Sequence, residues 1–240
     1  MSNVKAVMVR ELRSLFNSPV AYVVIVFFLV FTSVWLFYVQ QFFAQNLASL
    51  RDYFAIFPTV FILVIPATTM RSWAEERKLG TDELLLTYPI RESELVVGKF
   101  LAGLLLLIAV LVLTIPVAVT VTPFGFFEKG QIASEYLGVL LLGASGLSIG
   151  VLVSALSTNQ ITAFLVTAFV LLVLTFVGEI PKFVQMPIWL AGVLTYLSID
   201  GHFESFRKGL LDSRDVVYFL LLSVACLYSN VKVILLAKWK

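Results

Sequence analysis

The sequence has almost none of the residues that build metal, redox or disulfide chemistry. It contains one cysteine, Cys226, and one histidine, His202, in 240 residues. An intramolecular disulfide, a multi-cysteine metal site and a histidine cluster are therefore excluded. The phosphate-binding loop G-x-x-x-x-G-K-[ST] is also missing, because the Gly98–Lys99 pair lacks the upstream glycine and the following hydroxyl. We therefore expect a chain that is not an enzyme, binds no cofactor of its own and has no P-loop for ATP.

Charge is scarce as well. Only 13% of the residues are charged, 60% are hydrophobic, and the mean hydropathy is +0.99. A soluble domain is roughly 45–50% apolar, so this excess indicates that membrane lipid is the solvent. The formal net charge of +2 is too small to indicate a nucleic-acid partner.

Six apolar runs are long enough, or nearly so, to cross a bilayer as helices. They cover residues 21–40, 53–70, 100–121, 135–156, 162–178 and 216–237. The sequence thus predicts an all-α, polytopic membrane protein, with one transmembrane domain over residues 1–240 and the first run kept as a span. No run has Asp, Glu, Lys or Arg near its middle, where proton- or ion-coupled transporters usually keep such residues. A secondary transporter and an intramembrane enzyme are therefore disfavoured.

The flanking cations predict the orientation. Eleven Lys and Arg residues lie on the side of the two termini and residues 71–99, against six on the other side. By the positive-inside rule, both termini and the 71–99 segment are expected in the cytoplasm, in a bacterial inner membrane.

The first nineteen residues are too polar to span, and we interpret residues 1–19 as a helix lying in the membrane interface. A frayed polar tail is the alternative. Pro19 is the expected break before the first span. The helical spacing places on one face the apolar residues Val4, Met8, Leu12, Leu15 and Phe16, and on the other Arg10, Arg13 and Asn17.

Residues 179–214 are expected on the outer face. Their apolar part, residues 186–197, is too short for a full span and predicts a re-entrant or interfacial helix that packs on the bundle. His202 is expected to be a surface or loop histidine. The fourth run has a face of small residues, which predicts either close packing inside the chain or a dimer contact. These residues include Gly138, Gly143, Gly146 and Gly150.

The segment ATTMRSWAEERKLGTDELLLTYPIRESELVVGKFLAG holds an unusual density of charge between the second and third runs. Taken alone, it could be a solvated loop whose charges keep it out of lipid. It resembles the corresponding segment of ABC-2 type permeases, R-S-x-A-E-E-[RK]-x-x-G-T-x-E-L-L-L-T-x-P-[IV] followed by V-x-G-K. The matching residues are Arg71, Ser72, Ala74, Glu75, Glu76, Arg77, Gly80, Thr81, Glu83, Leu84, Leu85, Leu86, Pro89, Gly98 and Lys99. Within that family the chain most resembles the gliding-motility-associated permease GldF.

This resemblance implies that residues 71–99 hold a short cytoplasmic coupling helix that docks on a separate ATP-binding subunit. Gly80–Thr81 would end the helix from the second span, and Thr81 would cap a new one. Asp82 and Glu83 would lie in its first turn, Leu84–Leu86 would form an apolar knob, and Pro89 would end it. Around it, Glu75, Glu76, Arg77 and Lys78 would form a mixed-charge rim outside the bundle.

The same resemblance implies the partners. They are an ABC ATP-binding subunit in two copies, which holds ATP and Mg, and a second permease chain that is a copy or a paralogue. A GldG-like companion with a large extracytoplasmic domain is also implied. The expected function is ATP-driven movement of a substrate, outward. The alternatives are mechanotransmission or extraction of lipids or lipoproteins without solute transport, and a structural membrane scaffold.

Overall fold

The computed structural model describes residues 3–42, 50–81, 90–121 and 129–238, and in this part of the chain every regular element is a helix. The all-α prediction is therefore confirmed. The long elements are α1 (Asn3–Asn17), α2 (Pro19–Val34), α4 (Phe57–Thr69), α7 (Glu92–Val121), α8 (Lys129–Leu156), α9 (Gln160–Phe176) and α13 (Ser213–Lys238). The shorter ones are η1 (Trp35–Val39), α3 (Arg51–Ala55), α5 (Ala74–Leu79), η3 (Val177–Glu179), α10 (Ile180–Phe183), α11 (Ile188–Leu197) and α12 (Ile199–Arg207).

Five helices within the described residues are long and apolar enough to cross a membrane: Pro19–Val39, Glu92–Val121, Lys129–Leu156, Gln160–Phe183 and Ser213–Ala237. The run predicted as a second span, residues 53–70, is instead divided into α3 and α4 by a turn at Ile56. Pro58 explains the break, because proline lacks an N–H donor and is suited to the first turn of a new helix. The count of six spans is therefore not confirmed.

The helix α8 is the centre of the bundle. It contacts α4, α7, α9, α12 and α13, and its small face is filled by side chains of these neighbours. A Cβ atom at Gly138 would lie 2.6 Å from Phe206, and one at Gly143 would lie 3.1 Å from Phe61. Gly146 meets Ile65 in the same way. Of the two predicted uses of the small face, the structure shows internal packing.

The amphipathic helix predicted near the N-terminus is present as α1. Ser18 caps α2 by accepting a hydrogen bond from the Val20 N–H at 3.3 Å, and Pro19 occupies the first turn, as predicted. The buried residue of α1 is Val7, which lies against α7 where Gly98 has no side chain. A Cβ atom at Gly98 would be 2.7 Å from Val7, so this glycine allows the two helices to touch.

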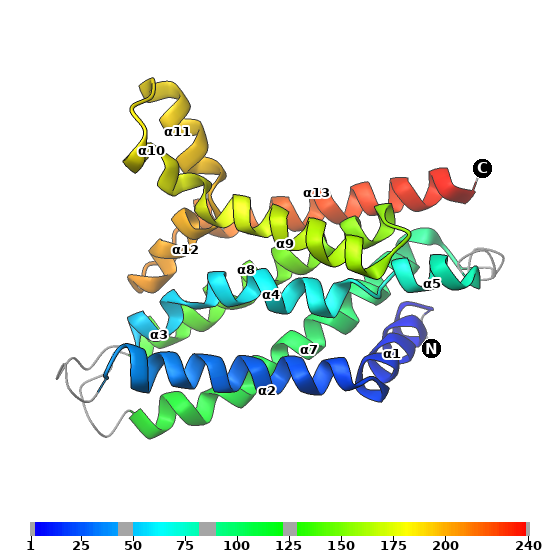
Figure 1. Ribbon diagram of the computed structural model, residues 1–240, viewed down its shortest axis with the longest axis horizontal. Coiled ribbons are helices and arrows are strands. Elements are labelled where there is room, and N and C mark those ends of the chain that lie inside the picture. Colours follow the sequence, from blue (N-terminus) through cyan, green and yellow to red (C-terminus); the bar gives the residue numbers. More distant parts are fainter. Residues whose placement is uncertain (1–2, 43–49, 82–89, 122–128, 239–240) are drawn as a thin grey trace.

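The two ends of the bundle differ in what they hold. In Figure 1 both termini, α1 and α5 lie at one end of the long axis, and α3 and α12 lie at the opposite end. This arrangement agrees with the predicted common side for the termini and for the start of the charged segment.

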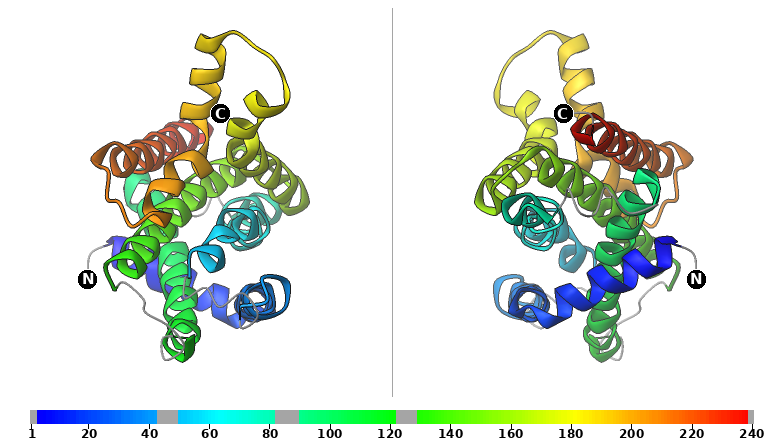
Figure 2. Two further views of the ribbon diagram at one scale, coloured as in Figure 1. Left: turned by 90° about the vertical axis from the view of Figure 1, so that its left-hand side faces the viewer. Right: turned by 90° about the vertical axis from the view of Figure 1, so that its right-hand side faces the viewer.

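The two helices α11 and α12 of the predicted outer segment, residues 179–214, differ in how they pack. The helix α12 packs on α8 through Ile199, Phe203 and Phe206, as expected. The prediction that residues 186–197 also pack on the bundle is wrong for most of α11, which has no buried residue and projects away from the long helices with α10 (Figure 1, Figure 2). Only its C-terminal end, among the described residues, contacts α13, where the Tyr196 ring meets Tyr218 and the Tyr218 hydroxyl donates to the Leu197 carbonyl oxygen. Ile188 is 91% exposed and Trp189 is 71% exposed. Since α11 is apolar on every side, its sequence gives no face a preference for the protein interior.

His202 also differs from its prediction. It is buried on the inner face of α12, and its ring contacts Asp215 Oδ1 through Nδ1 at 2.6 Å and the Tyr196 carbonyl oxygen through Nε2 at 2.9 Å. The reason is its helical spacing from Ile199 and Phe206, which places all three residues on one side of the helix.

Candidate functional site

The charged segment enters the structure as a turn after α4, followed by α5. The predicted coupling residues Glu83, Leu84, Leu85, Leu86 and Pro89 lie outside the described residues. The others, Glu75, Glu76, Arg77, Gly80 and Thr81, lie on α5 or directly after it. The site is therefore described from the turn, α5 and what they contact.

Lys99 is the centre of the site. Its side chain is 1% exposed, and its Nζ lies 2.9 Å from Glu76 Oε2 on α5 and 3.1 Å from Glu11 Oε1 on α1. It also donates to the Ser72 carbonyl oxygen at 2.6 Å. The ammonium lies 4.6 Å from the centre of the Trp73 ring, which is a cation–π contact. One buried charge on α7 thus connects α1, the turn after α4, and α5.

The structure places Glu76 inside this cluster and not on an exposed rim. Arg10 joins it from α1 by donating to Glu76 Oε1 at 3.1 Å, and Arg10 also lies 2.6 Å from Glu11. Burial raises the pKa of the Glu76 carboxyl, and the nearby Lys99 ammonium opposes that shift. The prediction that this side chain lies outside the bundle is therefore wrong. A carboxylate between two cations is well placed to hold helices together.

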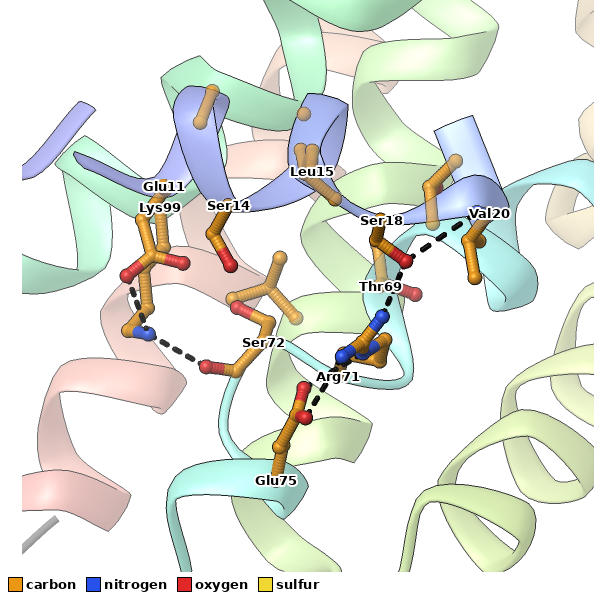
Figure 3. A pocket seen from close by; sticks show the side chains of 14 residues that line it. Glu11, Ser14, Leu15, Ser18, Val20, Thr69, Arg71, Ser72, Glu75 and Lys99 are labelled. Atoms are coloured by element: carbon orange, nitrogen blue, oxygen red, sulfur yellow. Dashed lines mark hydrogen bonds and ion pairs between the residues drawn. The ribbon is translucent and has the colours of Figure 1, made fainter. Parts of the chain in front are cut away.

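Glu75 points to the other side of α5 and pairs with Arg71. The contact is bidentate, with Arg71 Nε 2.7 Å from Glu75 Oε2 and a terminal nitrogen 2.8 Å from Oε1. The hydrogen bonds from Arg71 lower the pKa of the Glu75 carboxyl. Arg71 also donates to the Ser18 hydroxyl, so it links α5 to the junction of α1 and α2 (Figure 3).

The start of α5 is capped by a residue from another helix. The Ser154 hydroxyl, on α8, accepts hydrogen bonds from the backbone N–H groups of Trp73 at 3.0 Å and Ala74 at 3.2 Å. It also lies 3.2 Å from the Met70 carbonyl oxygen, to which it can donate at the end of α4. The first N–H groups of a helix have no intrahelical acceptor, so this serine fixes where α5 begins.

The end of α5 agrees only in part with the sequence prediction. Gly80 terminates α5 with a φ of +67°, a left-handed conformation that suits glycine. However, the helix from the second run has already ended at Thr69, so Gly80 ends a separate helix. The Thr81 hydroxyl donates to the Glu76 carbonyl oxygen at 3.3 Å, which stabilises the end of α5. Its predicted role at the start of a helix over residues 82–89 falls outside the described part.

A small polar cavity of about 50 Å³ lies between α1, the end of α4 and α7. Figure 3 shows Ser14, Ser18 and Ser72 around it, with Lys99 and Arg71 at its two ends. A space of this size suits one or a few water molecules. Nothing in the cluster forms a nucleophile–base pair, and the described residues contain no group of three metal-ligating side chains. The arrangement is suited to joining helices.

One sequence motif resembles the pattern around a catalytic serine. Residues 146–150 read G-L-S-I-G, which matches the nucleophile pattern G-x-S-x-G. In the structure they lie within α8, and the Ser148 hydroxyl donates to the Ser145 carbonyl oxygen at 2.6 Å. The strand-to-helix turn that this chemistry needs is absent here.

Sequence reasoning missed three members of the site, Glu11, Ser18 and Ser154. Each is distant in sequence from the charged segment, by 53 to 88 residues for the contacts above. The helical pattern of residues 1–19 did place Arg10 on a polar face, but no pattern connects that face to Glu76. Only the packing of α1 against α7 brings them together.

Comparison with known proteins shows the family of the chain. Residues 6–195 match the family described as "ABC-2 family transporter protein". Two curated relatives, each named "Probable multidrug ABC transporter permease YbhR", come from Escherichia coli strains K12 and O157:H7. Each is 28% identical over 155 residues, which is 64% of this chain and 40% of the relative. The chain thus matches less than half the length of these relatives. Because the family match spans most of the sequence, the chain belongs to the ABC-2 family of transporter proteins.

Proposed function

We propose that this transporter membrane subunit couples ATP hydrolysis on a separate ATP-binding subunit to outward movement of a substrate. The observation that carries the proposal is the Lys99 cluster. It connects α5, at the start of the predicted coupling segment, to α7 and to the interfacial helix α1. A force applied to the segment would therefore act on two membrane elements together. A scaffold needs no such connection.

We propose six membrane passes with both termini in the cytoplasm. The sixth pass is α3 and α4 taken together. They cover residues 51–69, which at about 1.5 Å per residue extend about 28 Å, close to the roughly 30 Å hydrocarbon core. Phe54, Phe57 and Pro58, which flank the break at Ile56, are all buried, so the break would not face lipid.

The proposed assembly contains two ATP-binding subunits, which hold ATP and Mg, and a second permease chain that is a copy or a paralogue. The resemblance to GldF adds a GldG-like extracytoplasmic companion, and gliding motility as the setting. The name of YbhR suggests instead that the substrate is a drug-like compound. Spans without central charges favour an apolar or amphiphilic substrate in either case.

The test is capture of the ATP-binding subunit that copurifies with this chain. Leu85→Asp would place a charge in the predicted apolar contact, where an unpaired charge costs several kcal/mol. Since about 1.4 kcal/mol is tenfold in affinity, capture and stimulated ATPase activity should fall at least tenfold. The purified chain alone should show no ATPase activity.

The matched control is Leu211→Asp, an exposed leucine after α12 at the opposite end of the bundle. It should leave both capture and ATPase rate unchanged. Wild-type capture and turnover by Leu85→Asp would refute the coupling assignment. ATP hydrolysis by the isolated chain would refute the proposal that the ATPase site lies on a separate subunit.

A further inference from the structure

We propose that the junction of α1 and α2 binds one anionic phospholipid, with its phosphate among arginines and an acyl chain along α2. This inference rests on the membrane placement of α2 and not on ATP coupling. It concerns two grooves at this corner of the molecule, the head groove and the tail groove, which are described in turn.

The head groove has a volume of about 840 Å³ and lies beside α1. Among the described residues, its lining includes Arg10, Arg13 and Arg71, together with Ser14 and Asn17, and no acidic residue. Arg10 and Arg71 have acidic partners, whereas Arg13 has no ion pair within the described part of the chain. Arginine recognises phosphate through paired N–H donors, so this lining fits a phosphodiester.

The tail groove, of about 660 Å³, follows one stripe of α2. It is lined only by apolar side chains from Tyr22 to Val34, and four of them are exposed by 56% or more: Tyr22, Val23, Val26 and Val30. The helix rises about 1.5 Å per residue, so the twelve steps from Tyr22 to Val34 extend about 18 Å. One leaflet, half of the roughly 30 Å hydrocarbon core, is about 15 Å deep. The tail groove therefore matches the depth of a single leaflet.

The head groove, beside α1, and the tail groove, along α2, meet at the start of α2. Pro19 lines the head groove, and its spacing of three, four and seven residues from Tyr22, Val23 and Val26 places it on the stripe that lines the tail groove. A polar, cationic space thus continues into an apolar one. A free anion would use only the head groove. A ligand with an anionic head and an apolar chain fills both, and an anionic phospholipid has that chemistry.

The test is native mass spectrometry of the full-length chain in detergent, titrated with phosphatidylglycerol, with phosphatidylcholine of the same chains, and with inorganic phosphate. Phosphatidylglycerol should bind at least tenfold more tightly than phosphatidylcholine. Arg13→Gln should weaken phosphatidylglycerol binding about tenfold, which corresponds to about 1.4 kcal/mol. Because Arg13 is exposed and unpaired within the described residues, this variant should fold normally.

The matched control is Lys5→Gln, which removes one exposed cation from the same helix but outside the head groove. It should bind phosphatidylglycerol like the wild type. An equal loss of phosphatidylglycerol affinity in Arg13→Gln and Lys5→Gln would refute a specific site, because it would indicate a general attraction of the lipid to the cations of α1. Equal affinity for the two lipids would refute recognition of an anionic headgroup. Binding of inorganic phosphate as tight as that of the lipid would refute a contribution from the acyl chain. Leu85→Asp should retain the lipid, so failure of the coupling proposal remains distinguishable.

Discussion

Replacing Lys99 by methionine should open the junction of α1, α5 and α7. The change keeps an unbranched side chain only one atom shorter but removes the ammonium that Glu76 and Glu11 share. At the 2.9 Å separation of Lys99 Nζ and Glu76 Oε2, an effective dielectric constant of about 20 gives a gross attraction of about 5–6 kcal/mol. Desolvation offsets part of it, and breaking a buried pair usually costs about 3–5 kcal/mol.

Hydrogen exchange of the backbone amides in α1 and α5 measures this cost directly, since it reports local opening. A loss of about 3 kcal/mol corresponds to more than a hundredfold faster exchange. The matched control is Lys232→Met, on α13, an exposed lysine over the Tyr228 ring. Its loss should change exchange in α1 and α5 by less than about twofold, because exposed contacts of this kind are worth little.

A double-mutant cycle with Glu76→Gln decides whether the two charges act on each other. If they do, the double variant should be more protected than the sum of the single losses predicts, by about 1.5–3 kcal/mol. The defect of Lys99→Met should also shrink as the pH falls. Burial already raises the pKa of Glu76, and loss of the opposing ammonium raises it further, so the folded state gains stability when the carboxyl is protonated. Additive losses, or a defect that does not change with pH, would refute the pairing.

Three further predictions concern α5 at the same end of the bundle and Lys208 at the opposite end. Ser154→Ala should leave two buried N–H groups at the start of α5 without an acceptor and cost about 1–3 kcal/mol, seen as faster exchange in α5 while α12 is unchanged. Glu75→Gln should destabilise α5 at pH 7 but not well below pH 4.5, because the lowered pKa of Glu75 gives stability that is lost as the pH falls; an equal effect at both pH values would contradict this. A cysteine at Lys208, in a Cys226→Ser background, should react with an impermeant reagent from outside, and reaction only after the inner face is exposed would reverse the topology.

The helices themselves could be predicted from the sequence because their signals are local. Five of the six apolar runs, the break at Pro19 and the polar stripe of residues 1–19 each act within one or two turns, and each appears in the structure as a helix or a helix start. The break at Ile56 was harder to predict. Pro58 was visible inside the run, but a proline in a membrane helix can cause either a kink or a new start. Packing against α8 decides between these outcomes.

The site was harder to predict because its meaning depends on tertiary packing. Glu75 and Glu76 are adjacent and chemically identical, so a loop, a rim and a buried cluster all fit their sequence. In the structure they point to different partners, Arg71 and Lys99, because neighbours in a helix are separated by about 100°. The sequence therefore shows that the segment is charged, but it does not show which residues Glu75 and Glu76 contact.

The distribution of these contacts bears on how coupling would work. If the charged residues of α5 were free for a partner, docking would have to order them, and a displacement of α5 would be absorbed by its own flexibility. Instead Glu75 and Glu76 already hold α5 to the α1–α2 junction and to α7, and Ser154 fixes its first turn to α8. We expect a segment held in this way to transmit a displacement as a rigid body. We therefore expect the apolar sequence Leu84–Leu86 to be recognised by the ATP-binding subunit, and Leu85→Asp to separate docking from folding.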